Sequence, residues 1–386
     1  MKLGLIGVGQ AGGKLLDEFL AYDAKTGSSI VRSAVAVNTA ATDLKGLANV
    51  PENNRILIGQ SRVKGHGVGG DNELGASIMQ DNIEEVQGAI NTVADIDAFF
   101  VVAALGGGTG SGGSPVLIRR LQELYEEPVY ALGVLPARGE GGLYSFNAAR
   151  SLRTVVREAD NLFLFDNDAW RETGESVDDA YGTLNEELVR RFGMLFSAGE
   201  IDASADVAQS VVDSSEIINT LAGGGISSVG YAVADLPEQG DEGLLSRFSD
   251  DDESIDAGAS DENRITSLVR SATLGRLTCP AEVRGAERAL VVVAGPPEYL
   301  NRKGIERART WLEEETGSLE VRGGDYPIPN ETKVAAAVVL SGLATVPRVD
   351  ELQDAAVETQ ETIEAQDAQR QEQQASLMDD DLDPLF

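Results

Sequence analysis

The stretch Leu105-Gly106-Gly107-Gly108-Thr109-Gly110-Ser111-Gly112-Gly113 directly follows the uninterrupted apolar run 98–104. Such a run predicts a strand that is buried on both faces. The stretch precedes Pro115-Val116-Leu117-Ile118, which predicts a first helical turn because proline fits near a helix start. Its glycines leave backbone N–H groups unobstructed, and Thr109 and Ser111 add hydroxyls, as an anionic phosphate at a helix N-terminus requires. The order of strand, glycine-rich loop and helix therefore predicts a phosphate-binding site.

A second glycine-rich loop lies near the start of the chain. Residues 3–6 predict a strand that leads into Gly7-Val8-Gly9-Gln10-Ala11-Gly12-Gly13-Lys14 and then a helical pattern. Taken alone, the glycine spacing matches the dinucleotide fingerprint and indicates an NAD-dependent oxidoreductase. That hypothesis requires an acid after the second strand to hold the ribose, whereas the predicted strand 34–37 ends in Asn38-Thr39-Ala40. It also leaves the later glycine-rich stretch unexplained, so it remains the weaker alternative.

The charge of the chain restricts the partners that it can bind. Its 386 residues carry 64 acidic and 31 basic side chains, a formal net charge of −33. Contacts to nucleic-acid phosphates need basic patches, so this balance argues against nucleic acid as a partner. Lysine is scarce relative to arginine, and self-repulsion is tolerable where salt shortens the Debye length to about 3 Å at 1 M. We interpret the acidity as an adaptation to a high-salt cytoplasm.

Two residue types that often carry chemistry occur only once each, as Cys279 and His66. A single cysteine excludes an intramolecular disulfide and a multi-cysteine metal site. A single histidine argues against Ser-His-Asp chemistry and histidine metal clusters. No apolar run reaches the about 18 residues of a membrane span, and residues 1–6 lead into a glycine turn without a signal-peptide pattern. These features predict a cytoplasmic protein with no direct membrane insertion.

The glycine-rich loops resemble those of the tubulin and FtsZ family of GTPases. Gly106-Gly107-Gly108-Thr109-Gly110-Ser111-Gly112 is similar to the family's signature loop, and Gly9-Gln10-Ala11-Gly12 to its first loop. Asn38-Thr39 and the loop 65–73 resemble the second and third loops, but Ala40 stands where the family usually has an acid. The resemblance implies GTP or GDP with Mg²⁺ as cofactors and leaves the metal's protein ligands unassigned. The residues that it implies around the phosphates are Gly9, Gln10, Ala11, Gly12, Gly13, Lys14, Asn38, Gly67, Gly107, Gly108, Thr109 and Gly110.

Later segments resemble the family's recognition sites for the nucleoside. Glu140 follows the predicted strand 128–135 at the position of the family's ribose-binding acid, with a solvated loop glutamate as the alternative. Asn167 follows the predicted strand 161–165 in the family's base-recognition loop, and its amide can both donate to and accept from a guanine edge.

A long helix is predicted over residues 177–195, because apolar residues recur there at three- and four-residue spacing. The resemblance implies that this is the family's central helix. It also implies that Tyr181 stacks on guanine and that Asn185, four residues later on the same face, reads the guanine edge.

Beyond that helix, Asp213 and Glu216 match the two acids of the loop with which family members complete GTP hydrolysis on a neighbouring subunit. Val211 replaces the asparagine of the family's bacterial pattern. The resemblance implies Glu216 as the catalytic acid, assisted by Asp213, and longitudinal contacts between copies of this chain. An ordinary helix N-cap with an acid in the first turn would have the same local sequence.

The order of the motifs predicts an α/β fold that resembles the tubulin/FtsZ architecture. We expect a Rossmann-like GTPase domain over 1–175, a central helix and catalytic loop over 176–222, and a second α/β activation domain over 223–345. Within the last part, the predicted elements are strands near 228–234, 289–294, 318–322 and 333–341 and helices near 264–274 and 303–315.

Two acidic segments predict disorder. One is a glycine-containing insertion at 237–263, and the other is the acidic tail 346–386, in which a short helix from Asp350 is followed by a disordered part. The final Asp383-Pro384-Leu385-Phe386 fits either a docking peptide for a partner or an inert tail.

The combination of FtsZ-like second and third loops, the tubulin-like pair Tyr181 and Asn185, and a halophilic composition resembles the archaeal CetZ group. This resemblance implies a GTP-dependent cytoskeletal polymer linked to cell shape or motility. A nucleotide-binding regulator that never polymerises remains an alternative, because polymerisation surfaces leave no local motif.

Overall fold

A computed structural model of the chain describes residues 1–90, 95–170, 177–199, 212–236 and 253–378. Within these residues the strands form one ten-stranded sheet in the order β3-β2-β1-β4-β5-β6-β7-β10-β8-β9. The first seven strands in this order are parallel, β10 is antiparallel to both of its neighbours, and β9 is parallel to β8. The predicted α/β fold is confirmed.

The strands are β1 (Leu3–Val8), β2 (Val31–Asn38), β3 (Arg55–Leu57), β4 (Ala98–Ala104), β5 (Val129–Leu135), β6 (Asn161–Asp166), β7 (Ile226–Asp235), β8 (Arg288–Gly295), β9 (Glu320–Pro327) and β10 (Lys333–Ser341). The helices are α1 (Gly9–Thr26), α2 (Ala41–Lys45), α3 (Gln60–Val63), α4 (Asn72–Asp81), α5 (Ile83–Ile90), α6 (Gly108–Leu124), α7 (Gly142–Glu158), α8 (Asn167–Trp170), α9 (Val177–Ala198), α10 (Ser214–Leu221), α11 (Glu253–Leu274), α12 (Arg302–Thr316) and α13 (Pro347–Met378).

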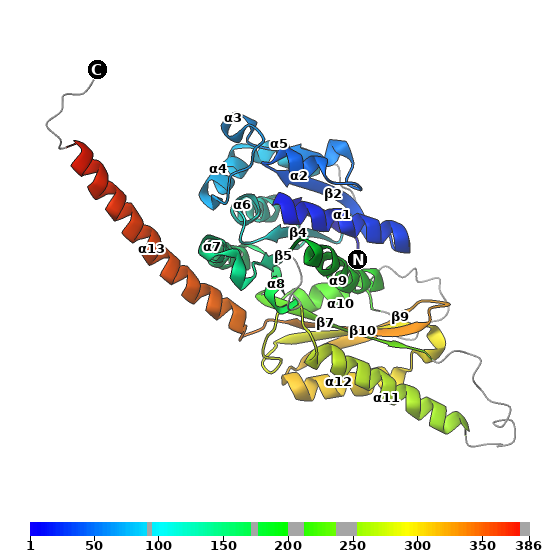
Figure 1. Ribbon diagram of the computed structural model, residues 1–386. Helices are drawn as coiled ribbons and strands as arrows, with labels where there is room; N and C mark the ends of the chain where they lie inside the picture. The colour runs from blue at the N-terminus through cyan, green and yellow to red at the C-terminus, as the bar shows by residue number, and fades with distance from the viewer. Residues whose placement is uncertain (91–94, 171–176, 200–211, 237–252, 379–386) are drawn as a thin grey trace.

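Both faces of the sheet are covered by helices (Figure 1). One hydrophobic core contains side chains of α4, α5, α6, α7, α11, α12 and α13, and the other contains side chains of α1, α2, α9 and α10. Strand β4 contributes to both: Phe99 and Val101 face the first core, whereas Phe100 and Val102 face the second. This two-sided burial explains why β4 is an uninterrupted apolar run rather than an alternating one.

The central helix α9 joins the two halves of the sheet. Phe192 and Phe196 on α9 pack against Phe100 of β4, with ring centroids 5.7 and 5.1 Å apart. The same core includes Val292 of β8 and Val339 of β10. Because one helix face serves both halves, the phosphate loops and the later strands are held in a fixed relation.

The strand order reverses between β1 and β4. The chain runs outward from β1 through β2 to β3, and then returns to place β4 on the other side of β1. In parallel α/β sheets, the loops at such a switch point separate and leave a crevice at the carboxyl ends of the strands. Here those loops are the two glycine-rich stretches.

Helix α6 begins earlier than the sequence predicts. Its first residue is Gly108 inside the glycine-rich stretch, and Pro115 lies within the helix rather than in its first turn. Pro115 cannot donate to the carbonyl of Ser111 four residues earlier, but the hydroxyl of Ser151 on α7 donates to that carbonyl at 2.8 Å. Glycine also permits close packing, since a Cβ on Gly112 would lie 2.0 Å from the Asn72 carbonyl oxygen on α4.

Three later segments also differ from prediction. Strand β9 starts at Glu320 and continues to Pro327, beyond the predicted 318–322. Helix α11 starts at Glu253, so the part of the acidic insertion from 253 to 263 is helical; the preceding residues 237–252 lie outside the described residues.

The predicted short helix of the tail is instead the long helix α13, which ends at Met378 and whose far end projects away from the body (Figure 1). Its alanine, glutamine and glutamate residues favour helix, and Gln360 Nε2 donates to Glu364 Oε1 one turn later at 2.9 Å. The final peptide, 383–386, lies outside the described residues.

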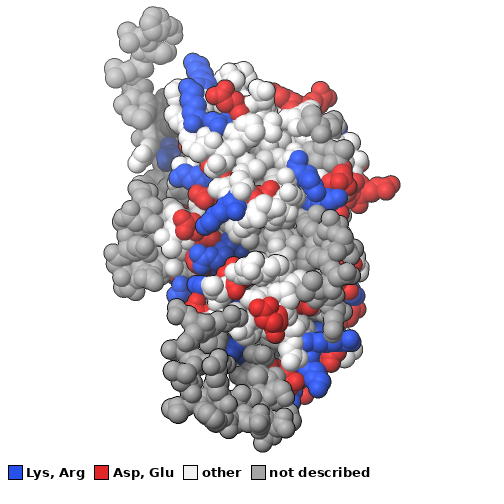
Figure 2. Space-filling model, turned by 90° about the vertical axis from the view of Figure 1, so that its right-hand side faces the viewer, with Lys and Arg blue, Asp and Glu red and all other residues white. Residues whose placement is uncertain are grey.

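The surface shown in Figure 2 carries basic and acidic side chains interspersed, without one large basic area. Among the described residues, the helices are all too short or too polar to cross a membrane.

Candidate nucleotide-binding site

A pocket of about 520 Å³ lies where the β1 and β4 loops separate. Its wall contains thirteen of the residues that the sequence predicts around a nucleotide: Gly9, Gln10, Ala11, Lys14, Asn38, Gly67, Gly107, Gly108, Thr109, Gly110, Glu140, Asn167 and Asn185. These residues come from seven separate segments between positions 9 and 185. The fold therefore brings the predicted phosphate, ribose and base residues to one cavity of a size suited to a small ligand.

Two helix N-termini meet at this pocket. Helix α1 follows Val8 and helix α6 follows Gly107, and neither N-cap residue makes a side-chain capping hydrogen bond. Neither helix has an acid in its first turn. The first N–H groups of each helix lack partners within the helix, and the helix dipole adds positive potential there. Together the two ends suit an anion.

Glycine is required where the two loops approach each other. Gly9 has φ = 75°, and a Cβ on it would lie 3.0 Å from the backbone nitrogen of Gly110. A side chain at this position would meet both backbone strain and a steric clash. The glycine therefore lets the ends of α1 and α6 share one ligand.

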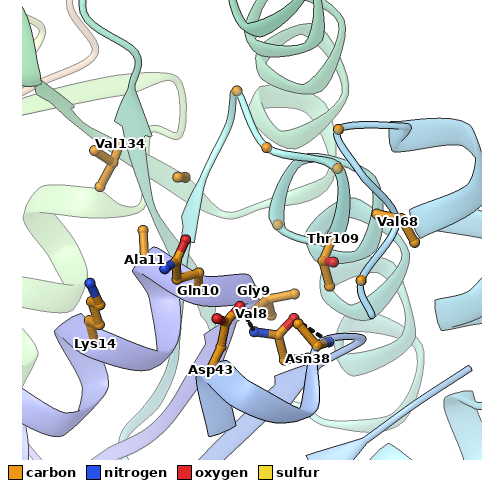
Figure 3. A pocket seen from close by; sticks show the side chains of 18 of the residues that line it. Val8, Gly9, Gln10, Ala11, Lys14, Asn38, Asp43, Val68, Thr109 and Val134 are labelled. Atoms are coloured by element: carbon orange, nitrogen blue, oxygen red, sulfur yellow. Dashed lines mark hydrogen bonds between the residues drawn. The ribbon is translucent and has the colours of Figure 1, made fainter. Parts of the chain in front are cut away.

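Asn38 and Asp43 form the wall beside the phosphate loops (Figure 3). Asn38 Nδ2 donates to Asp43 Oδ2 at 3.0 Å, and Asn38 Oδ1 accepts from the backbone N–H of Thr39 and Ala40. The hydroxyls of Thr39 and Thr109 lie 2.7 Å apart and are buried, which ties the second loop to α6.

Asp43 was missed by the sequence analysis. It lies in α2, three residues after Ala40, and both residues line the pocket. Helical spacing of three places two side chains on one face. An acid three residues after Ala40, the position where the family usually has an acid, was therefore the signal in the sequence. Thr42, His66 and Tyr144 also line the pocket and were given no binding role.

The opposite end of the pocket carries amides. The side chain of Asn167 is 8% exposed, Asn185 is half-buried, and neither side-chain amide makes a hydrogen bond within the described residues. Amides of this kind can satisfy both donors and acceptors of a base. The side chain of Tyr181, predicted to stack on the base, lies outside the described residues.

Glu140 also lines the pocket, but its carboxylate has a partner. Its Oε1 accepts from the backbone N–H of Ala137 at 2.7 Å. This bond orders the short turn Arg138–Glu140 between β5 and α7.

Gly12 and Gly13 do not line the pocket, although the sequence analysis places both around the phosphates. Both glycines are buried on α1. A Cβ on Gly12 would lie 2.3 Å from the carbonyl oxygen of Val102, and a Cβ on Gly13 would lie 3.6 Å from Leu47. Gly12 therefore permits α1 to pack closely on β4, the role that the third glycine of a dinucleotide fingerprint also has.

A buried ion pair supports the base end of the pocket. Arg348, in the first turn of α13, places its Nε 3.4 Å from Asp166 Oδ1, and both side chains are about 95% buried. Its Nη2 donates to the carbonyl of Pro136 at 2.7 Å. Burial raises the pKa of the Asp166 carboxyl above its ordinary value, and the charge of Arg348 partly offsets this rise. Pro136 and Asn167 are lining residues, so α13 braces the pocket wall from outside.

Asp213 and Glu216 lie apart from the pocket lining, at the start of α10. Asp213 is the N-cap, and its Oδ1 accepts from the backbone N–H of Glu216 at 3.0 Å. A hydrogen bond from the Ser215 hydroxyl lowers the pKa of Asp213, and the capped backbone N–H lowers it further. Glu216 Oε2 lies 3.1 Å from Arg322 Nη1 on β9. The cap interpretation of Asp213 is thus realised in the structure.

Comparison with protein families gives two matches that together span most of the chain. Residues 2–175 match the model described as the Tubulin/FtsZ family GTPase domain. Residues 174–358 match the model described as the tubulin-like CetZ C-terminal domain.

Individual relatives agree with these matches. The tubulin-like protein CetZ1 of Haloferax volcanii is 62% identical over 370 residues, which cover 94% of each chain. A solved structure of CetZ1 from Haloferax volcanii as a GDP-bound monomer superposes with a TM-score of 0.83 at 58% identity, covering 93% of this chain and all of that one. A CetZ2 structure from the same organism, described as a GTPγS-bound protofilament, gives 0.83 at 45% identity, covering 94% and 100%. The chain therefore belongs to the tubulin/FtsZ family of GTPase-domain proteins, in its CetZ group.

Proposed function

We propose that this chain binds GTP in the pocket, assembles end to end with copies of itself, and hydrolyses GTP where two subunits meet. The observation that carries the proposal is the convergence of two helix N-termini without side-chain caps on a pocket whose other end carries two amides that have no hydrogen-bond partner among the described residues. The helix ends suit the phosphates and the amides suit guanine. Control of cell shape or motility in the cytoplasm is the cellular role that we propose for such assemblies.

The relatives support nucleotide binding and assembly. The CetZ1 structure contains GDP, and the CetZ2 structure is a protofilament with GTPγS. The dinucleotide hypothesis has less support, because β2 ends in Asn38, whose amide is hydrogen-bonded to Asp43.

The residues present fit a magnesium ion that accompanies the triphosphate. Mg²⁺ is usually held by one or two carboxylates, phosphate oxygens and water. Asp43 and the amide oxygen of Gln10 are the lining groups that would face it. Among the described residues no group of three His, Cys, Asp or Glu could hold a metal by itself. When bound, Mg²⁺ neutralises charge that builds on the phosphate oxygens.

Hydrolysis needs a group that can accept the proton of water. Water attacks the γ-phosphorus, the bond to the β–γ bridging oxygen breaks, and GDP leaves with that oxygen. On the pocket wall, Asp43 accepts from Asn38 and faces the position proposed for the metal, and Glu140 accepts from Ala137. Glu216 lies outside the pocket and is 38% exposed, so it can reach the phosphates of another subunit. We assign it the proton-accepting role, with Asp213 fixing the start of α10.

Large apolar side chains are exposed beside both sites. Leu143 and Tyr144, next to the pocket, are 46% and 40% exposed. Leu319 is 99% exposed and precedes Glu320, whose partner Arg288 donates to the Asn219 carbonyl of α10. Adjacent exposed apolar side chains, such as Leu143 and Tyr144, are suited to a protein contact surface. They support a contact that includes the pocket end of a subunit.

The experiment measures GTP hydrolysis per molecule across protein concentrations in molar KCl, together with sedimentation in GTP, in GDP and without nucleotide. Wild-type activity per molecule should rise steeply with protein concentration. The wild-type protein should sediment only in the presence of GTP. Glu216→Gln should bind GTP normally and hydrolyse it about 10²–10⁴-fold more slowly. Glu320→Gln, an exposed acid paired with Arg288, is the matched control and should behave as wild type.

Two outcomes would overturn the proposal. Activity per molecule that is independent of concentration would place the complete site in one subunit. Hydrolysis of GTP without any sedimenting assembly would favour the alternative of a nucleotide-binding regulator that never polymerises.

A further inference from the structure

Glu216 has a cationic partner from a distant part of the chain. Arg322 lies on β9, 106 residues after Glu216, and its Nη1 donates to Glu216 Oε2 at 3.1 Å. The two side chains are 33% and 38% exposed. The pair therefore lies at the surface, at the start of α10, rather than in the core.

Most hydrogen-bonding capacity of Arg322 is unused. A guanidinium has five N–H donors in a planar fork. Within the described residues its side chain donates only to Glu216, and its Nε is buried without a hydrogen-bond partner. Buried donors are usually satisfied in native structures. The Nε is enclosed by this subunit, but the remaining N–H groups at the Nη end of Arg322 have donors for a group that the described residues do not supply.

The shared site proposed above has an electrostatic conflict that Arg322 resolves. Bringing Asp213 and Glu216 toward the phosphates of another subunit places negative charge against negative charge. The repulsion grows as water is excluded from the contact and the local dielectric falls. A cation that arrives together with the acids offsets it. Arginine is suited to this because its fork matches both carboxylate and phosphate geometry.

We propose that Arg322 acts across the subunit contact as a phosphate-binding cation, resting on the shared-site function above. Its Nη1 holds the Glu216 carboxylate, and the other N–H groups at the Nη end bind γ-phosphate oxygens of the neighbouring subunit. No bond to Arg322 forms or breaks. It stabilises negative charge on the phosphate while Glu216 accepts the proton of the attacking water.

A purely structural ion pair is the competing explanation, and Arg288 provides a matched control for it. Arg288 lies on the adjacent strand β8, is 27% exposed, pairs with Glu320 at 2.7 Å and donates to the α10 carbonyl of Asn219 at 3.2 Å. It therefore shares the neighbourhood, exposure and acid pairing of Arg322 without contacting Glu216.

The test compares Arg322→Gln, Arg322→Lys, Arg288→Gln and Glu216→Gln in molar KCl. The measurements are the thermal midpoint, GTP affinity of dilute protein, the amount of protein sedimented with GTP, and the hydrolysis rate per sedimented molecule. Arg322→Gln should retain the wild-type midpoint and GTP affinity, and lose about 10³-fold in rate per sedimented molecule. Arg322→Lys should recover part of the rate, and Arg288→Gln should match wild type.

The failures can be told apart. If Arg322→Gln hydrolyses as fast as Arg288→Gln while Glu216→Gln is slow, the shared site stands and the role of Arg322 is wrong. If Arg322→Gln weakens GTP binding to dilute protein, it acts within its own subunit, which also overturns the inference. If Glu216→Gln is itself as fast as wild type, the shared site has failed.

Discussion

The nucleotide pocket and the start of α10 are built in different ways. The pocket is lined by loops that each follow a strand and carry their own motif, such as the segment from Gly106 to Gly110 after β4. The α10 surface depends on Glu216 and Arg322, which are 106 residues apart and have no motif in common. A site made of local loops can be read from sequence, whereas a site made by distant pairing requires the fold.

The largest effect that we predict concerns the base end of the pocket, which Arg348 supports from a distant part of the chain. Arg348→Met leaves the Asp166 carboxylate buried without its ionic partner. Removing one member of a buried pair costs about 3–5 kcal/mol of unfolding free energy. Denaturant unfolding in molar KCl measures this loss. Arg138→Met is the control, because Arg138 is 57% exposed in its pair with Glu351 and such pairs contribute about 0–1 kcal/mol.

The pH dependence of the stability of Arg348→Met tests whether the buried Asp166 charge causes the loss. The pKa of Asp166 is already raised by burial, and losing Arg348 raises it further. A carboxyl whose folded pKa exceeds its unfolded pKa binds protons better in the folded state, so stability increases as pH falls through the folded pKa toward the unfolded pKa. The variant should therefore recover stability on mild acidification, and the double variant with Asp166→Asn should recover it at neutral pH. A loss that is equal at all pH values would contradict the buried-charge explanation.

The sequence predicted more of the pocket than of its surroundings for a physical reason. Backbone N–H groups bind phosphate wherever glycine and a helix start allow it, so Gly107 and Gly108 could be placed from local sequence. Gly12 has the same local appearance, but its role is set by the distance between α1 and Val102. Arg348 and Arg322 gave no signal, because an isolated arginine does not reveal which acid it meets.

In the C-terminal tail, the sequence predicts less order than the structure has. The composition of the tail predicts disorder after a short helix, yet the described part of the chain is helical through Met378. Acidic composition lowers the tendency to form a core, but it does not prevent helix where alanine, glutamine and glutamate dominate. The first turns of α13 are also fixed by burial, since Leu352 is fully buried against the body.

An intermediate effect is expected at the base end of the pocket. Asn185→Ala removes an amide that has no other partner in the described structure and faces the pocket. Losing one hydrogen bond to a buried base costs about 1–3 kcal/mol, a roughly 5- to 150-fold weaker affinity for GTP and GDP alike. Calorimetry on dilute protein measures it. Glu186→Ala, the exposed neighbour on α9, is the control. Unchanged affinity would remove Asn185 from the base site.

The smallest effect on stability that we predict concerns Asp213, at the start of α10. As the N-cap of α10 its carboxylate accepts from Glu216 N–H, so Asp213→Ala should cost about 0.5–2 kcal/mol, whereas Asp213→Ser keeps a capping oxygen and costs much less.

The lowered pKa of Asp213 fixes the sign of its pH dependence. Its contribution is present above the unfolded carboxyl pKa and is lost as pH falls through the lower folded value, so wild type should lose this increment in acid and Asp213→Ala should not. Asp213→Ser separates the two roles, because it retains the cap and removes the charge. If the charge also serves at the subunit contact, Asp213→Ser will unfold like wild type but hydrolyse GTP more slowly per sedimented molecule. Wild-type hydrolysis by Asp213→Ser would instead leave Asp213 as a cap alone, with the carboxylate chemistry of the α10 surface carried by Glu216.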